Sequence, residues 1–173
     1  MKDFLTLSKE RYSVRKFSDK PVEEEKIDAV IEAALAAPTA VNFQPVRLWS
    51  LRSQDAIDKF LGCTKFEFFK NVEAIIVVGG KISEAWERPS DKRRFADVDA
   101  TIVATHIMLE IADLGLGTTW IGHFDAPKLA SLFPEMSGCE LVAAFPIGYA
   151  AEDCEPSPRH SQRRSRDEIV KEL

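Results

Sequence analysis

The chain has 173 residues, of which 45% are hydrophobic, enough for one domain over residues 1–173 with a sizeable core. Its 23 basic and 28 acidic residues give a net charge of −5, which argues against a nucleic-acid-binding surface. The three cysteines are widely spaced and lack zinc-ligand spacing, so we expect reduced thiols and no metal site. Without an apolar signal region or a run of membrane length, a cytoplasmic protein is expected.

The first half of the chain predicts helices and strands in alternation. Apolar residues recur at helical spacing from Ile27 to Leu35, and Pro38 ends that helix. A continuous apolar run at 74–78 is typical of a central strand. In chain order, the predicted elements are a helix at 3–10, a helix at 22–37, a strand at 46–51, a helix at 53–62 and a strand at 74–78.

The second half begins with a charged stretch at 81–96 that is either a lid or a solvated loop. The helix predicted at 97–114 is apolar on more than one stripe, so it is expected in the middle of the domain or at a subunit interface. The remaining predicted elements are a strand at 118–121, a short helix after Asp125 and a strand at 141–149, whose Pro146 favours an edge or a bulge. Together the elements predict an α+β fold, a mixed central sheet flanked by helices.

Basic residues stand near both ends of the chain, with a small-residue loop between them. Arg11, Ser13 and Arg15 lie within five residues, and Arg163 and Arg164 sit in a tail rich in proline and serine. Guanidinium groups match phosphate oxygens, whereas an amide-rich loop such as 37–45 suits the carbonyls and ring nitrogens of a flat heterocycle. The pattern indicates a nucleotide-like cofactor, preferentially flavin mononucleotide (FMN). A domain that binds another phosphate ligand is the weaker alternative.

Five segments in this order resemble the nitroreductase family of FMN-dependent oxidoreductases. The resemblance covers almost the whole chain and implies an α+β homodimer with two FMN sites, each built from both subunits, and with the long helix buried at the interface. The segments are Arg11-x-Ser13-x-Arg15-Lys16-Phe17, Ala37-Pro38-Thr39-Ala40-x-Asn42-x-Gln44-Pro45, Leu114-Gly115-Leu116-Gly117-Thr118-x-Trp120-Ile121-Gly122, Pro146-Ile147-Gly148-Tyr149, and Arg163-Arg164.

The same resemblance assigns roles to individual residues. The N-terminal motif would hold the phosphate, ribityl chain and pyrimidine side of FMN, and the tail would close on the phosphate. The loop would come from the partner subunit, and the amide of Gly122 would lie near flavin N5. The expected cofactor contacts are Arg11, Tyr12, Ser13, Arg15, Pro38, Thr39, Ala40, Asn42, Gln44, Trp120, Ile121, Gly122, Arg163 and Arg164, with His123 as a substrate contact.

The implied chemistry needs no catalytic side chain, because reduced flavin carries hydride reactivity at N5. NADH or NADPH would reduce FMN and leave, and an electron-poor acceptor such as a nitroaromatic or a quinone would follow in a ping-pong cycle. A flavin-binding protein without turnover, or a specialised dehalogenase or enoyl reductase, are the alternatives. The basic run 92–94 is a solvated loop face or, if it folds over the pocket, a site for the NADPH phosphate.

Overall fold

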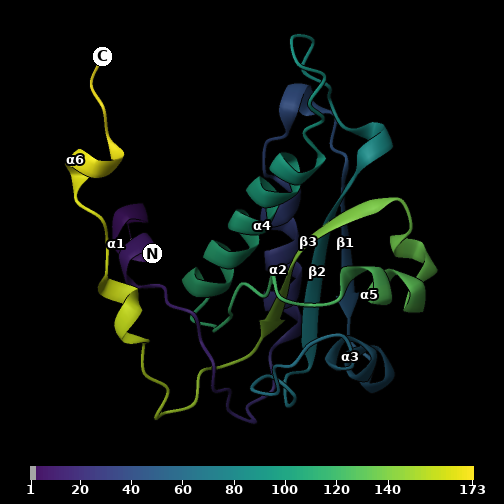
Figure 1. Ribbon diagram of the computed structural model, residues 1–173. Coiled ribbons are helices and arrows are strands. Elements are labelled where there is room, and N and C mark those ends of the chain that lie inside the picture. The colour runs from purple at the N-terminus through teal and green to yellow at the C-terminus, as the bar shows by residue number, and fades with distance from the viewer. Residues whose placement is uncertain (1–2) are drawn as a thin grey trace.

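The computed structural model describes residues 3–173 and shows helices on both faces of a small sheet (Figure 1). The sheet has the order β1-β2-β3, formed by β1 (Val46–Leu51), β2 (Ala74–Lys81) and β3 (Cys139–Ile147). Both outer strands run antiparallel to β2. The α+β class is therefore confirmed, whereas the expected mixed sheet is wrong, because all three strands pair in antiparallel fashion.

All five predicted helices are present, and three of them begin at a residue whose side chain caps them, Asp3, Ser53 or Asp125. The side chain of Ser53 accepts a hydrogen bond from the Ala56 amide, and Asp125 accepts one from the Lys128 amide. Within residues 3–173, no helix is long and apolar enough to cross a membrane. The helices are α1 (Phe4–Glu10), α2 (Glu24–Leu35), α3 (Gln54–Leu61), α4 (Ala96–Asp113), α5 (Ala126–Leu132) and the unpredicted α6 (Arg166–Ile169).

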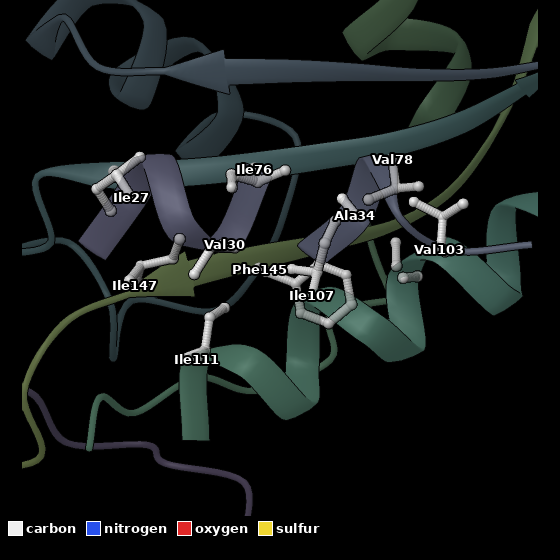
Figure 2. Packing of buried hydrophobic residues seen from close by; sticks show 14 of the residues in the cluster. Ile27, Val30, Ala34, Ile76, Val78, Val103, Ile107, Ile111, Phe145 and Ile147 are labelled. Carbon is white, nitrogen blue, oxygen red and sulfur yellow. The ribbon is translucent and has the colours of Figure 1, made fainter. Parts of the chain in front are cut away.

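Strand β2 lies in the middle of the sheet, as predicted, and both of its faces are covered. Ile76 and Val78 face a core formed with α2 and α4, while Ile75 and Val77 face a second core formed with α3 and α5. Successive side chains of a strand point to opposite faces, so a strand buried on both sides is apolar throughout. The first core contains residues of α2, α4 and β3 that pack around β2 (Figure 2): Ile27, Val30, Ala34, Ile107, Ile111, Phe145 and Ile147.

Residues 118–121, predicted as a strand, make only isolated bridges, so this prediction is wrong. Ile121 pairs with Ala144 of β3, and Gly117 pairs with Gly148. Between these two bridges, the same register puts Thr119 opposite Pro146, which has no N–H to donate. The ladder between the two bridges is interrupted there, and β3 remains an edge strand of the sheet.

The charged stretch after β2 folds back on itself. A turn at Ile82–Glu84 leads into a bridge between Glu87 and Arg94, and the rings of Trp86 and Phe95 meet edge to face at 5.0 Å. This small hairpin ends where α4 begins. A lid and a solvated loop both stay open as alternatives for this segment.

Candidate functional site

A cavity of about 580 Å³ lies between the N-terminal segment and the C-terminal tail. It brings together four of the predicted cofactor contacts, Arg11, Ser13, Arg15 and Arg163. Arg164, also predicted, is not among the lining residues. Figure 1 shows the same arrangement at the level of the chain, with the tail running beside α1. The cavity is lined by Arg11, Ser13, Arg15, Ser157, Arg159, His160 and Arg163.

The N-terminal side of the cavity is an extended segment around Val14, which packs against the residues that follow α4. The Val14 amide donates to the Thr118 carbonyl at 2.9 Å, and the Val14 side chain is buried. Because side chains alternate along an extended chain, Val14 points inward while Ser13 and Arg15 line the cavity. A Cβ on Gly117 would lie 2.7 Å from the Val14 side chain, so this close docking requires glycine there.

The tail is held against this segment by contacts on its other side. The Tyr12 hydroxyl donates to the Cys154 carbonyl at 3.1 Å, and the rings of Tyr12 and His160 meet edge to face at 6.4 Å. The His160 Nε2 lies 3.0 Å from the Lys9 carbonyl oxygen, and Arg163 donates to the His160 carbonyl. Tyr12 therefore joins the tail to the N-terminal segment but does not line the basic cavity.

The cavity concentrates positive charge that carboxylates do not neutralise. Within residues 3–173, no ion pair joins a carboxylate to Arg11, Arg15, Arg159 or Arg163. Burial and, to a smaller extent, the charge of Arg163 lower the pKa of Arg11. The two guanidinium groups therefore disfavour each other's charge, and an anion between them would relieve that cost.

The loop at 38–45 lies outside this cavity. The Thr39 hydroxyl accepts from the Gln44 amide at 3.0 Å, and the Gln44 side chain donates to the Asn42 side chain at 3.0 Å. Thr39 and Gln44 line a different pocket of about 270 Å³. Within one chain, the predicted loop contacts Pro38, Thr39, Ala40, Asn42 and Gln44 are thus separate from the predicted phosphate contacts.

The segment after α4 leaves few groups available to a ligand. The Ile121 side chain is buried, and its N–H and C=O both pair with Ala144. Trp120 is half-buried and packs edge to face on Phe145 at 5.2 Å. Gly122 is exposed, and a Cβ there would meet only the Trp120 indole nitrogen at 3.9 Å, so its backbone is open to approach.

His123, the predicted substrate contact, lies on the surface beside this segment. Its carbonyl accepts a hydrogen bond from the Thr64 hydroxyl at 3.1 Å, and its ring meets that of Phe66 edge to face at 5.8 Å. It lies apart from the basic cavity in the folded chain.

Three lining residues were not predicted: Ser157, Arg159 and His160. Ser157 caps the turn at Pro158–Ser161 through the Arg159 amide, and this turn carries the other two side chains to the cavity. A serine before proline followed by two basic residues is a sequence signal for such a turn. Nothing in the local sequence indicates that the turn packs against Lys9 and Tyr12.

The fold and the cavity define an α+β protein with an arginine-lined cavity between the two ends of its chain. The model of the nitroreductase family matches residues 8–65 and 62–149, so this chain belongs to the nitroreductase family.

Relatives support the same family. The crystal structure of a nitroreductase family protein from Clostridium difficile 630 has 32% sequence identity and a TM-score of 0.89, and the match covers 98% of each chain. A Methanothermobacter thermautotrophicus protein, provisionally named NADH dehydrogenase/NAD(P)H nitroreductase, is 27% identical over 87% of this chain and 79% of its own length. A provisionally named nitroreductase from Desulfovibrio desulfuricans, solved in complex with FMN, has 24% identity and a TM-score of 0.81 over 100% of this chain and 98% of that one.

Proposed function

We propose that this protein is an FMN-dependent oxidoreductase that passes reducing equivalents from NADH or NADPH to an electron-poor acceptor such as a nitroaromatic or a quinone. The observation that carries the proposal is the cavity with four arginines free of carboxylate partners in the described chain, in a member of the nitroreductase family. The FMN complex of the Desulfovibrio desulfuricans relative supports the choice of cofactor.

The residues present suit a flavin phosphate and its ribityl chain. Arg11 and Arg163 both line the cavity and would supply guanidinium groups for the phosphate dianion, and the Ser13 hydroxyl suits a ribityl hydroxyl. The buried Thr118, whose backbone bridges that of Ser13, lines a neighbouring pocket of about 220 Å³ and not this cavity.

The bound flavin would supply hydride chemistry by itself, and the protein would bind, orient and tune it. Arg15 is exposed at the cavity and would place a positive charge beside the pyrimidine side of the ring. The open backbone of Gly122 would offer an amide to the ring, whereas the main-chain groups of Ile121 are already paired. Binding and electrostatics are therefore the tasks assigned to this chain's own residues.

A homodimer would complete the site, because one chain holds the loop at 38–45 away from its own basic cavity. Large apolar side chains on α1 and α2 are exposed: Phe4 by 70% and Leu35 by 69%. A groove of about 550 Å³ between α1 and α4 is lined by Phe4, His106 and Leu109 among others. Exposed apolar surface of this kind marks a protein–protein interface, and burying it against a second copy would place α4 at the interface.

The visible absorption spectrum of the purified protein tests the proposal, followed by anaerobic NADPH and then a quinone. We expect flavin bands that bleach with NADPH and return with the acceptor. Retained FMN that NADH and NADPH both fail to reduce would instead indicate a flavin-binding protein without turnover. A colourless protein that takes up no added FMN would reject the cofactor, and tight FMN retention by a monomer would reject the shared site.

A further inference from the structure

The loop between α2 and β1 has an unusual backbone. Val41, Asn42 and Gln44 have φ angles of 47°, 58° and 52°, in the left-handed region that favours glycine. This conformation is especially costly for a β-branched residue such as valine. A run of strained residues persists only where the surrounding structure holds it, and such runs are concentrated at functional sites.

The loop's own side chains provide little of that support. Val41 is 63% exposed and Phe43 is 55% exposed, so neither anchors the loop in the core. Its internal hydrogen bonds connect the Asn42 amide to the Thr39 carbonyl and the Gln44 amide to the Thr39 hydroxyl, both at 3.0 Å. These bonds shape the loop but do not attach it to the rest of the molecule.

Pro45, at the end of the loop, accepts a hydrogen bond of 2.7 Å from the Lys81 amide of β2. Within residues 39–44, the attachment is a buried carboxylate on α4. Asp99 is 0% exposed, and its Oδ1 accepts a hydrogen bond of 2.8 Å from the Ala40 amide. Within residues 3–173, its Oδ2 has no hydrogen-bond partner. Asp99 lies in the first turn of α4, where the helix dipole favours a negative charge. A hydrogen bond to a buried carboxyl group therefore joins the strained loop to this helix.

The first turn of α4 is itself a rigid support. A Cβ on Gly80 of β2 would lie 2.2 Å from the Ala96 carbonyl oxygen, so strand and helix are in direct backbone contact. The Phe95 amide donates to the Trp86 carbonyl at 3.0 Å, and the Asp99 amide donates to the Phe95 carbonyl at 2.9 Å. The Asp99 carboxylate is thus fixed relative to the central strand.

We propose that Asp99 is a positioning residue for the flavin: by fixing the Ala40 amide, it holds the loop at 39–44 in the strained shape that contacts the cofactor. The flavin contact rests on the function proposed above, whereas the anchoring does not. A carboxylate with one oxygen left without a partner is a poor device for stability, because that oxygen loses its hydration for no hydrogen bond. What the buried carboxyl group does provide is a hydrogen bond of 2.8 Å to one amide of the loop.

The test compares three variants, first as flavin-free proteins. A cooperative thermal unfolding transition shows beforehand that each variant is folded. Asp99→Ala removes the acceptor, and Asp99→Asn keeps an acceptor oxygen of the same shape. Asp97→Ala is the matched control, because Asp97 lies in the same turn of α4 and pairs with Arg93 on the outside. The measurement is amide hydrogen exchange at Asn42, Phe43 and Gln44, whose amides all bond within the loop.

We expect Asp99→Ala to accelerate exchange at these amides by about ten-fold, from the loss of the hydrogen bond that anchors the loop. Asp99→Asn should stay within about three-fold of the parent protein, and Asp97→Ala should leave exchange unchanged. FMN dissociation constants, measured by flavin fluorescence, should follow the same order. Unchanged loop exchange in Asp99→Ala, or equal effects of the two Asp99 variants, would overturn the proposal.

If Asp99→Ala does not fold, Ala40→Pro removes the same hydrogen bond from the loop side. Thr39 is extended, at φ −130° and ψ 162°, which suits a residue before proline, and Ala40 begins the short turn at Ala40–Asn42. Faster exchange at Asn42 and Gln44 is expected, and unchanged exchange would overturn the anchor. Faster exchange with unaltered FMN affinity would keep the anchor and reject the loop as a flavin contact. If the protein binds no FMN, the proposed function fails, but the exchange measurement still tests the anchor because it needs no flavin.

Discussion

Two regions of this protein are rich in arginine, and they differ in whether carboxylates pair with the arginines. Around the basic cavity, Arg11, Arg15 and Arg163 have no carboxylate ion-pair partner in the described chain. In the hairpin after β2, Arg88 pairs with Asp91, Arg93 with Asp97 and Arg94 with Glu87. The number of basic residues in a segment therefore does not identify an anion site; the availability of their charge does.

The difference bears on the expected role of residues 92–94. Lys92 and Arg94 both lie 3.6 Å from carboxylate oxygens of Glu87, and the Arg93 guanidinium lies over the Phe95 ring at 5.6 Å. These cations are already partnered, and none of them lines the cavity. The structure therefore favours the solvated-face alternative over a site for the NADPH phosphate.

The largest effect should come from removing both ends of the basic cavity. In Arg11→Ala/Arg163→Ala we expect FMN affinity to fall by about a hundred-fold or more, because two charge-assisted contacts to one phosphate are lost. The measurement is FMN retention through gel filtration and a fluorescence titration. Full retention by the double variant would show that the two ends of the chain do not hold the cofactor together.

A smaller effect is expected for Arg159, one of the three residues that only the tertiary structure placed in the cavity. Arg159→Ala should weaken FMN binding by about three- to ten-fold, since an exposed cation contributes less than a partly buried one. Arg166→Ala, in the exposed helix α6, is the matched control and should have no effect on FMN affinity. Equal titration curves for the two variants would remove Arg159 from the site.

The hairpin should contribute little to donor selection. Arg93→Ala/Arg94→Ala is expected to change KM for NADPH and for NADH by less than about two-fold each, because both cations are exposed and internally paired. Steady-state kinetics with a quinone acceptor gives both constants. A selective rise in KM for NADPH would show that the hairpin does recognise the phosphate.

The smallest effect concerns the charge of one hairpin carboxyl. The hydrogen bond from Arg88 lowers the pKa of Asp91 from 3.8 to about 2. Because the pKa is lower in the folded protein, the pair stabilises the hairpin fully above about pH 4 and loses this contribution as the pH falls through about 2. NMR titration should give a midpoint near 2 for Asp91, and Arg88→Ala should return it toward 3.8. An unshifted midpoint in the parent protein would disprove the pairing in solution.

Much of the fold followed from local pattern. The apolar periodicity predicted α2 and α4, and the continuous apolar run predicted β2 as the central strand. The strand expected at 118–121 was wrong for a reason that involves two distant segments. Only when Pro146 is placed opposite Thr119 does the missing N–H interrupt the ladder.

By itself, the sequence determined the local features of this protein: the helices α1 to α5 and the apolar central strand. Only the tertiary structure decided which charges remain available and which groups meet. It brought Arg159 and His160 to the cavity, paired the hairpin arginines with acids, and placed Asp99 beneath the amide of Ala40. The physical reason is that periodicity depends on neighbours along the chain, whereas desolvation, ion pairing and close packing depend on residues far apart in sequence.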